Sequence, residues 1–245
     1  MNEQEKKTKA EVITAPIAII IAGALIAGAV YFSANKGPAS SALNDGAVAK
    51  QQLLKGDLNQ MAAISASDHI RGNLNAEVLI VEYSDTECPF CKVLHNTMNE
   101  VMDEYGGTGK VAWVFRHFPL DNLHPKARSE AVALECANEQ GGNDKFWAYA
   151  DRLFEVTPSN NRLDSAELPK IAEFVGLNIS QFNTCLASGK YTKRIDDDIK
   201  NAQATGGNGT PWSIVVAKNG KKYQLSGAQP LASIKQLIET ALQEK

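Results

Sequence analysis

Two cysteines separated by two residues, Cys88 and Cys91, restrict the fold of this chain more than any other feature. The run from Glu77 to Tyr83 before them is rich in valine and isoleucine, as in a buried strand. After them, apolar residues recur at helical spacing as far as Gly106. Residues 110–118 predict a second strand. The cysteine pair therefore opens a helix within a strand, helix, strand unit.

The start of a helix changes the chemistry of a cysteine. The helix dipole and the free backbone N–H groups favour the thiolate, so the pKa of Cys88 should fall below the usual value of about 8.5. Cys91, one turn further on, can then attack a mixed disulfide on Cys88. Pro89 suits the first turn, where no N–H is needed, and Phe90 should offer an exposed apolar contact to substrates. We expect a redox-active pair.

A stable structural disulfide or half of a zinc site is the alternative for two cysteines at this spacing. A zinc site needs four ligands, and Cys136 and Cys185 form no second pair of the same kind. His95 follows Cys91 by one turn on the same helix, whereas His117 and His124 flank the second strand and the loop after it. The strand and helix around the pair favour redox chemistry, so we expect no metal and no cofactor.

The rest of the chain predicts a block of helices, then two strands and a last helix. Ser165 and Ser180 are predicted to cap two of the helices, and Asn219-Gly220 is typical of a tight hairpin turn. A separate helical domain would leave this hairpin without a sheet to join. We therefore expect an α/β fold in which a helical insert, at about 121–205, interrupts a small sheet.

An apolar stretch near the N-terminus predicts a membrane anchor. Residues 13–32 would span about 30 Å as a helix, the thickness of a bilayer's hydrocarbon core. The lysines before it should keep residues 1–12 in the cytoplasm, so that the remaining chain is exported on a flexible tether at 33–67. A cleaved signal peptide is the alternative, with Ser40-Ser41-Ala42 as the cleavage site, although its apolar region would normally be shorter.

Composition narrows the class of protein. Hydrophobic residues make up 44% and charged residues 22%, which excludes a wholly disordered chain. The net charge of −3 provides no basic surface for nucleic acid, so we expect no nucleic-acid partner. Four cysteines are too few for a fold built on disulfides, but an exported domain can keep them oxidised.

The sequence resembles the DsbA-like thiol–disulfide oxidoreductases of the thioredoxin superfamily over residues 68–245. The resemblance rests on five pieces, in chain order: Asp68–Gly72, Glu82-Tyr83-Ser84-Asp85, the CPFC helix start, Arg116-His117-Phe118-Pro119-Leu120, and Gly209-Thr210-Pro211. It implies a thioredoxin-like fold with an inserted helical domain. Together with the apolar stretch at 13–32, it predicts a monomer held in the bacterial cell membrane by a single transmembrane helix, with its catalytic domain on the periplasmic or extracellular side.

The resemblance implies roles for individual residues. Cys88 would be the attacking cysteine and Cys91 the resolving one. Pro211 would be a cis-proline beside them, leaving the backbone of Thr210 free to pair with an extended substrate, and Trp212 would border the substrate groove. The alternative for this proline is an ordinary trans bond in a loop.

Three further residues complete the predicted set. Glu82 would be a proton relay beneath the cysteines, because burial on its strand should raise its pKa; the alternative is a solvated glutamate on an edge strand. Cys136 and Cys185 fall on two helices of the insert, where the resemblance implies a structural disulfide. Two separate buried thiols are the alternative.

The expected function is transfer of the Cys88–Cys91 disulfide to newly exported, cysteine-containing proteins. A quinone-linked membrane oxidase of the DsbB or VKOR type would then reoxidise the pair. A reductase or isomerase of the same fold is an alternative, although residues 33–67 are too short for an isomerase's dimerisation domain. Phe90 stands where the best-known member has histidine, which leaves the strength of the oxidant open. A membrane-anchored binding module and a metal chaperone are alternatives of other classes.

Overall fold

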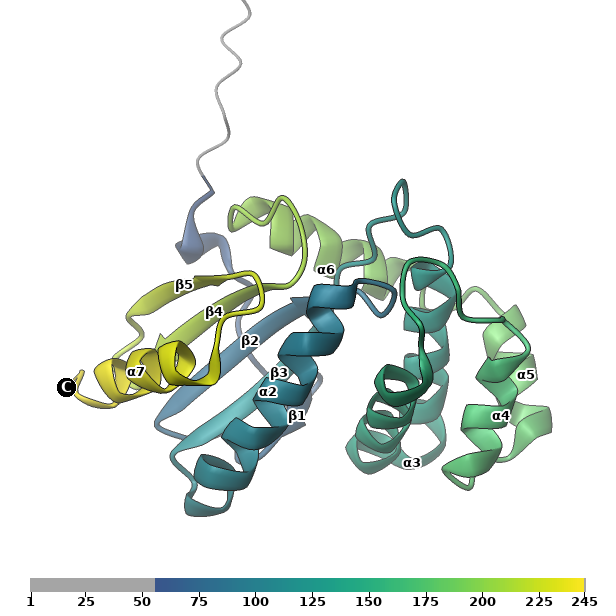
Figure 1. Ribbon diagram of the computed structural model, residues 1–245, viewed down its shortest axis with the longest axis horizontal. Helices are drawn as coiled ribbons and strands as arrows, with labels where there is room; N and C mark the ends of the chain where they lie inside the picture. The colour runs from purple at the N-terminus through teal and green to yellow at the C-terminus, as the bar shows by residue number, and fades with distance from the viewer. Residues whose placement is uncertain (1–55, 245) are drawn as a thin grey trace, which may run out of the picture. The chain divides into compact units, whose positions relative to one another are not determined.

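The computed structural model describes residues 56–244 (Figure 1). In this part of the chain a five-stranded sheet has the strand order β1-β3-β2-β4-β5. The central strands β2 and β3 run parallel, and the other neighbours are antiparallel. The strands are β1 (His69–Arg71), β2 (Val78–Ser84), β3 (Val111–His117), β4 (Trp212–Ala217) and β5 (Lys222–Ser226).

Helices lie on both faces of the sheet, and the inserted ones follow β3. They are α2 (Pro89–Tyr105), α3 (Ala127–Val156), α4 (Glu167–Phe174), α5 (Ile179–Ala187), α6 (Thr192–Ala204) and α7 (Leu231–Leu242), with short 3-10 turns η1 (Leu58–Gln60) and η2 (Gly106–Thr108). This arrangement agrees with the predicted thioredoxin-like α/β fold and its helical insert.

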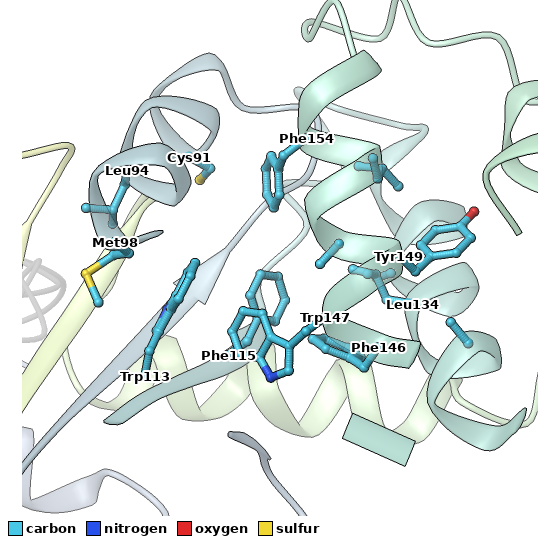
Figure 2. Close-up of a cluster of buried hydrophobic side chains, with 14 of the residues drawn as sticks. Cys91, Leu94, Met98, Trp113, Phe115, Leu134, Phe146, Trp147, Tyr149 and Phe154 are labelled. Carbon is cyan, nitrogen blue, oxygen red and sulfur yellow. The ribbon is translucent and has the colours of Figure 1, made fainter. Parts of the chain in front are cut away.

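Strand β2 is buried on both faces, which explains its unbroken run of apolar residues. Val78 and Ile80 join the larger core, which α2, α3 and α7 cover. Val81 and Tyr83 join a second core on the opposite face, against α6. Figure 2 shows the larger core, in which side chains of α2, β3 and α3 pack together.

The predicted elements differ from the observed ones in detail. The longest element of the predicted helical block, α3, has a break at Gly141 and Gly142, whose backbone angles are non-helical. The predicted cap at Ser180 is wrong: the Asn178 side chain caps α5 and accepts the Gln181 N–H at 3.0 Å. The predicted cap at Ser165 is also wrong, because α4 has Ala166 at its N-cap and no side-chain cap.

The last residues of the predicted tether belong to the folded domain. The N–H of Asp57 donates to the Ala204 carbonyl at 3.1 Å. The guanidinium of Arg116 donates to the carbonyls of Ala62 and Ala63 at 3.1 and 3.3 Å. These contacts place the start of the domain before Asp68.

The predicted anchor at 13–32 lies outside the described residues, as do the cytoplasmic segment and most of the tether. Within residues 56–244, no helix has the length and apolar character that crossing a membrane requires.

A disulfide joins Cys136 of α3 to Cys185 of α5. Their Cα atoms are 5.8 Å apart, and 49 positions separate them along the chain. Both residues are buried in the larger core. The bond therefore closes a long loop within the insert and limits the conformations of the unfolded chain.

Replacing both residues, as Cys136→Ala with Cys185→Ala, should lower the free energy of unfolding by about 2 to 4 kcal/mol, because the unfolded chain regains its loop entropy. Urea denaturation of the wild type and the double variant measures this difference. With a reductant strong enough to open the bond, the gap between the two proteins should largely close. Equal stability without reductant would show that the bond contributes nothing.

Candidate active site

Cys88 and Cys91 lie at the N-terminal end of α2, just after β2. Cys88 is the N-cap residue and Pro89 occupies the first turn, as a proline without an N–H can. Both cysteines are free thiols in this structure. Cys88 is 4% exposed and Cys91 is fully buried, at the edge of the larger core (Figure 2). The outer sulfur is thus the one that a substrate could reach.

Ionisation of Cys88 is favoured by its neighbours. The hydrogen bond from the Cys91 thiol lowers the pKa of Cys88 to about 6, although burial opposes ionisation. The Thr210 hydroxyl and the backbone N–H groups of Phe90 and Cys91 act in the same direction. These N–H groups are the free donors of the first helical turn. Cys88 is therefore largely a thiolate at neutral pH.

Cys91 behaves in the opposite way. Burial raises the pKa of Cys91 well above its ordinary value, and the hydrogen bond to Cys88 and the charges of Cys88 and Glu82 raise it further. The N–H of Asp85 contacts its sulfur at 3.4 Å. The pair therefore shares its protons unequally: Cys88 gives its proton up and Cys91 keeps its own.

Glu82 lies on β2 and is fully buried. Its Oε2 accepts the indole N–H of Trp113 at 3.0 Å. Burial raises the pKa of Glu82 to about 7, and the charge of Cys88 also raises it. Glu82 therefore titrates near neutral pH and interacts electrostatically with both cysteines. The solvated edge-strand alternative does not apply, since β2 is a central strand.

Thr210 and Pro211 lie beside Cys88, and the peptide bond between them is cis. The Cys88 thiol, when protonated, donates to the Thr210 carbonyl at 3.5 Å. Trp212, which was expected to border the substrate groove, points into the core instead. It is only 4% exposed, and its indole N–H donates to the Thr205 hydroxyl at 3.0 Å. Trp212 is thus a core residue that presents little surface to a substrate groove.

Exposed apolar side chains lie on the cysteine-bearing helix α2 and on the loop after β3. Phe90 is 63% exposed, as the sequence predicted, and Val93 on the next turn of α2 is also exposed. Leu123 is exposed on the loop after β3. That loop is tied to the residue before Cys88, because Asn161 donates both to the Leu123 carbonyl and to the Glu87 carboxylate. Val93 and Leu123 were not predicted from the sequence, where nothing marks their exposure.

A buried aspartate holds the loop after β3 against the cysteines. Asp85 accepts the backbone N–H of Leu120 at 2.8 Å and the ring N–H of His124 at 2.9 Å. It also accepts the N–H of Glu87 at 2.8 Å. Burial raises the pKa of Asp85. These hydrogen bonds hold the segment Asp85–Cys88 against the loop after β3, and His124 contributes one of them.

Among residues 56–244, one cluster has the composition of a metal site. The ligand atoms of His69, His117 and Glu135 lie within 4.8 Å of one another. Both imidazole Nε2 atoms contact Glu135 Oε1, at 2.8 and 2.9 Å, and the guanidinium of Arg194 contacts the same oxygen at 2.6 Å. A guanidinium in this position opposes a metal cation. The cluster is a buried ion-pair network that joins β1 and β3 to the insert.

The histidines of the zinc alternative have carboxylate partners of their own. His95 pairs with Asp151 at 2.8 Å, and His117 and His124 pair with Glu135 and Asp85. Within the described part of the chain, the two cysteines belong to no cluster of three metal-ligating side chains. The geometry therefore favours thiol chemistry at this site.

Comparisons with known proteins agree with this geometry. The sequence model of a family described as Thioredoxin matches residues 65–240. The curated relatives include the Na(+)/H(+) antiporter NhaA 1 of Mycolicibacterium vanbaalenii, 35% identical over 174 residues, or 70% of this chain and 26% of the relative. NhaA 3 of Salinispora tropica is 35% identical over 156 residues, or 64% of this chain and 22% of the relative. This chain thus spans about a quarter of the length of these relatives.

Solved structures give the same fold. DsbA2 of Pseudomonas aeruginosa is 27% identical, with a TM-score of 0.60 over 73% of this chain and 96% of that one. Oxidised BdbD of Bacillus subtilis has a TM-score of 0.66 over 75% and 97% of the two chains, and its 22% identity supports the fold alone. The family match over residues 65–240, together with the geometry at Cys88, shows that the chain belongs to the thioredoxin family as a DsbA-like member.

Proposed function

We propose that this thiol–disulfide oxidoreductase donates the Cys88–Cys91 disulfide to substrate proteins. The observation that carries the proposal is the unequal affinity of the two sulfurs for protons. The pKa of Cys88 is about 6, whereas the pKa of Cys91 is raised well above its ordinary value. A stabilised thiolate at Cys88 stabilises the reduced pair, and a pair with a stable reduced form is a strong oxidant.

In the first step a substrate thiolate attacks the sulfur of Cys88. A substrate–Cys88 disulfide forms, the Cys88–Cys91 bond breaks, and Cys91 leaves with the electron pair. Cys91 is fully buried, so its sulfur needs a proton. Glu82, with a pKa of about 7, is the proposed source of that proton.

In the second step another thiolate of the substrate attacks the substrate sulfur of this mixed disulfide. The substrate disulfide forms and Cys88 leaves as the thiolate that its surroundings stabilise. The substrate loses two electrons and the cysteine pair gains them. Each turnover therefore leaves a reduced pair, which another oxidant must reoxidise.

Substrate contacts follow from the surroundings of Cys88. The backbone of Thr210 is the proposed partner of an extended peptide, and its carbonyl, 3.5 Å from the Cys88 sulfur, supports this assignment. Pro89 and the exposed Phe90 and Leu123 provide apolar surface beside it. These features suit unfolded, cysteine-containing proteins as substrates.

The cellular setting rests on the N-terminal sequence. A retained helix at 13–32 would hold the domain on the outer face of the bacterial cell membrane, where newly exported proteins arrive reduced. A quinone-linked membrane oxidase of the DsbB or VKOR type would be within reach of a tethered domain and could reoxidise the cysteine pair. Both the anchor and this partner are part of the proposal.

The reduction potential of the Cys88–Cys91 pair tests the proposal. The full chain is equilibrated in glutathione buffers, and alkylation at each cysteine is mapped by mass spectrometry, so that Cys136 and Cys185 are followed separately. We expect a value of about −120 mV, as in a disulfide donor with a stabilised reduced form. A value near about −270 mV would assign the pair to a reductase instead.

Replacing Glu82 with glutamine tests the proton source. Because the pKa of Glu82 is raised to about 7, the protonated form that can supply Cys91 is present below pH 7 and is lost as the pH rises through 7. We expect Glu82→Gln to slow disulfide donation below pH 7 by at least about tenfold. The fall in rate that the wild type shows as the pH rises through 7 should be absent in this variant. Stopped-flow oxidation of a thiol, corrected for its own ionisation, measures the rates.

Glu77→Gln is the matched control, because Glu77 precedes the same strand but is exposed. The control should keep the wild-type rate and pH profile. A Glu82→Gln variant that reacts like this control would remove Glu82 from the mechanism.

A further inference from the structure

We propose that residues 56–64, here called the N-terminal brace, position the cis-proline loop, residues 205–211, for reaction with peptide substrates. The brace lies in the segment that the sequence assigned to a flexible tether. In Figure 1 it is the first coloured part of the chain, next to α6 and β5. The inference rests on the proposed role of Thr210 in substrate contact and adds a residue set that controls it.

Two glycines form the contact between the brace and the loop. Gly56 crosses the backbone at Gly206 so closely that a β-carbon on residue 56 would overlap Thr205 and Gly206. A β-carbon on Gly206 would in turn lie 3.1 Å from the Gly56 Cα, and Gly206 has a φ of +105°, which disfavours other residues. The Asp57 N–H donates to the Ala204 carbonyl beside this crossing, at 3.1 Å.

Helix α6 fixes the rest of the brace. The amide of Asn201 donates to the Gln60 carbonyl at 2.7 Å and accepts the Ala62 N–H at 3.0 Å. Leu58 and Met61 pack against the second core, which contains Trp212. The brace is therefore held by both backbone hydrogen bonds and apolar packing.

The cis-proline loop is confined between the brace and Trp212. The Trp212 indole N–H donates to the Thr205 hydroxyl at 3.0 Å, and a β-carbon on Gly207 would lie 3.0 Å from the Trp212 ring. The loop then continues to Thr210, whose carbonyl is 3.5 Å from the Cys88 sulfur. A displacement of the loop at Gly206 would therefore be transmitted along residues 207–210 to the backbone of Thr210, which would contact a peptide.

This arrangement predicts that peptides and small thiols depend differently on the position of the loop. A peptide needs both the Cys88 sulfur and the backbone of Thr210, so its reaction depends on the position of the loop. A small thiol such as 2-mercaptoethanol needs only the sulfur. Because the thiolate at Cys88 is stabilised chiefly by Cys91, disturbing the brace should leave the titration of Cys88 largely unchanged.

The test compares Gly56→Ala with the wild type in the full, oxidised chain. Stopped-flow rates are measured with a reduced, extended cysteine peptide and with 2-mercaptoethanol. We expect the rate with the peptide to fall by at least about fivefold, because a contact to the peptide is lost. The rate with 2-mercaptoethanol should stay within about twofold of the wild-type rate. Gly107→Ala is the matched control, since a β-carbon on Gly107 would meet nothing within 4 Å. It should change neither rate.

Leu58→Ala provides a second variant in case Gly56→Ala fails to fold. It removes only apolar contacts of the brace and should reduce the peptide rate selectively in the same way. Folded variants in which both rates stay at the control values would overturn the brace while leaving disulfide donation intact. Equal losses for the two thiols would also overturn it, because they indicate general damage. If the wild-type protein reacted no faster with the peptide than with 2-mercaptoethanol, the substrate contact at Thr210 would be refuted. The proposed role of the brace would then be refuted as well.

Discussion

The burial of Cys91 beneath Cys88 is the constraint on which the chemistry of this domain depends. Strand β2 is buried on both faces, and α2 begins directly beyond its end, so the second cysteine of the pair enters the core while the first remains at its edge. Burial keeps the proton on Cys91, and the same proton makes a hydrogen bond that favours the thiolate of Cys88. One packing arrangement thus produces two sulfurs of opposite character.

Much of this arrangement can be predicted from the sequence because it is local. The apolar run before Cys88, the helical spacing after it and the proline in the first turn each indicate one element. The place of Pro211 beside Cys88 is different in kind, since the two are far apart in the chain. It was expected only through the resemblance to a family, and the cis bond at Thr210 agrees with that resemblance.

The parts that were missed depend on long-range contacts. Residues 56–64 have the composition of a tether, yet Asn201 and Arg116 bind their backbone, and no local pattern shows such bonds. Trp212 follows Pro211 in sequence, which suggested a groove residue, but its side chain packs into the core under α6. Strand β1 is only three residues long and pairs with one neighbour, so periodicity could not reveal it.

The most direct test of the central claim compares the stabilities of the reduced and oxidised proteins. Because the pKa of Cys88 falls from its ordinary value to about 6 on folding, its thiolate stabilises the reduced fold above pH 6, and this contribution grows until the pH reaches the ordinary thiol value of about 9. That contribution is lost as the pH falls through 6. Urea denaturation of the protein in which only Cys88 and Cys91 are reduced, with the Cys136–Cys185 bond kept closed, should therefore show this form to be more stable than the fully oxidised protein at pH 7.5, with a smaller advantage at pH 5. A more stable oxidised protein, with a difference that does not depend on pH, would contradict the account.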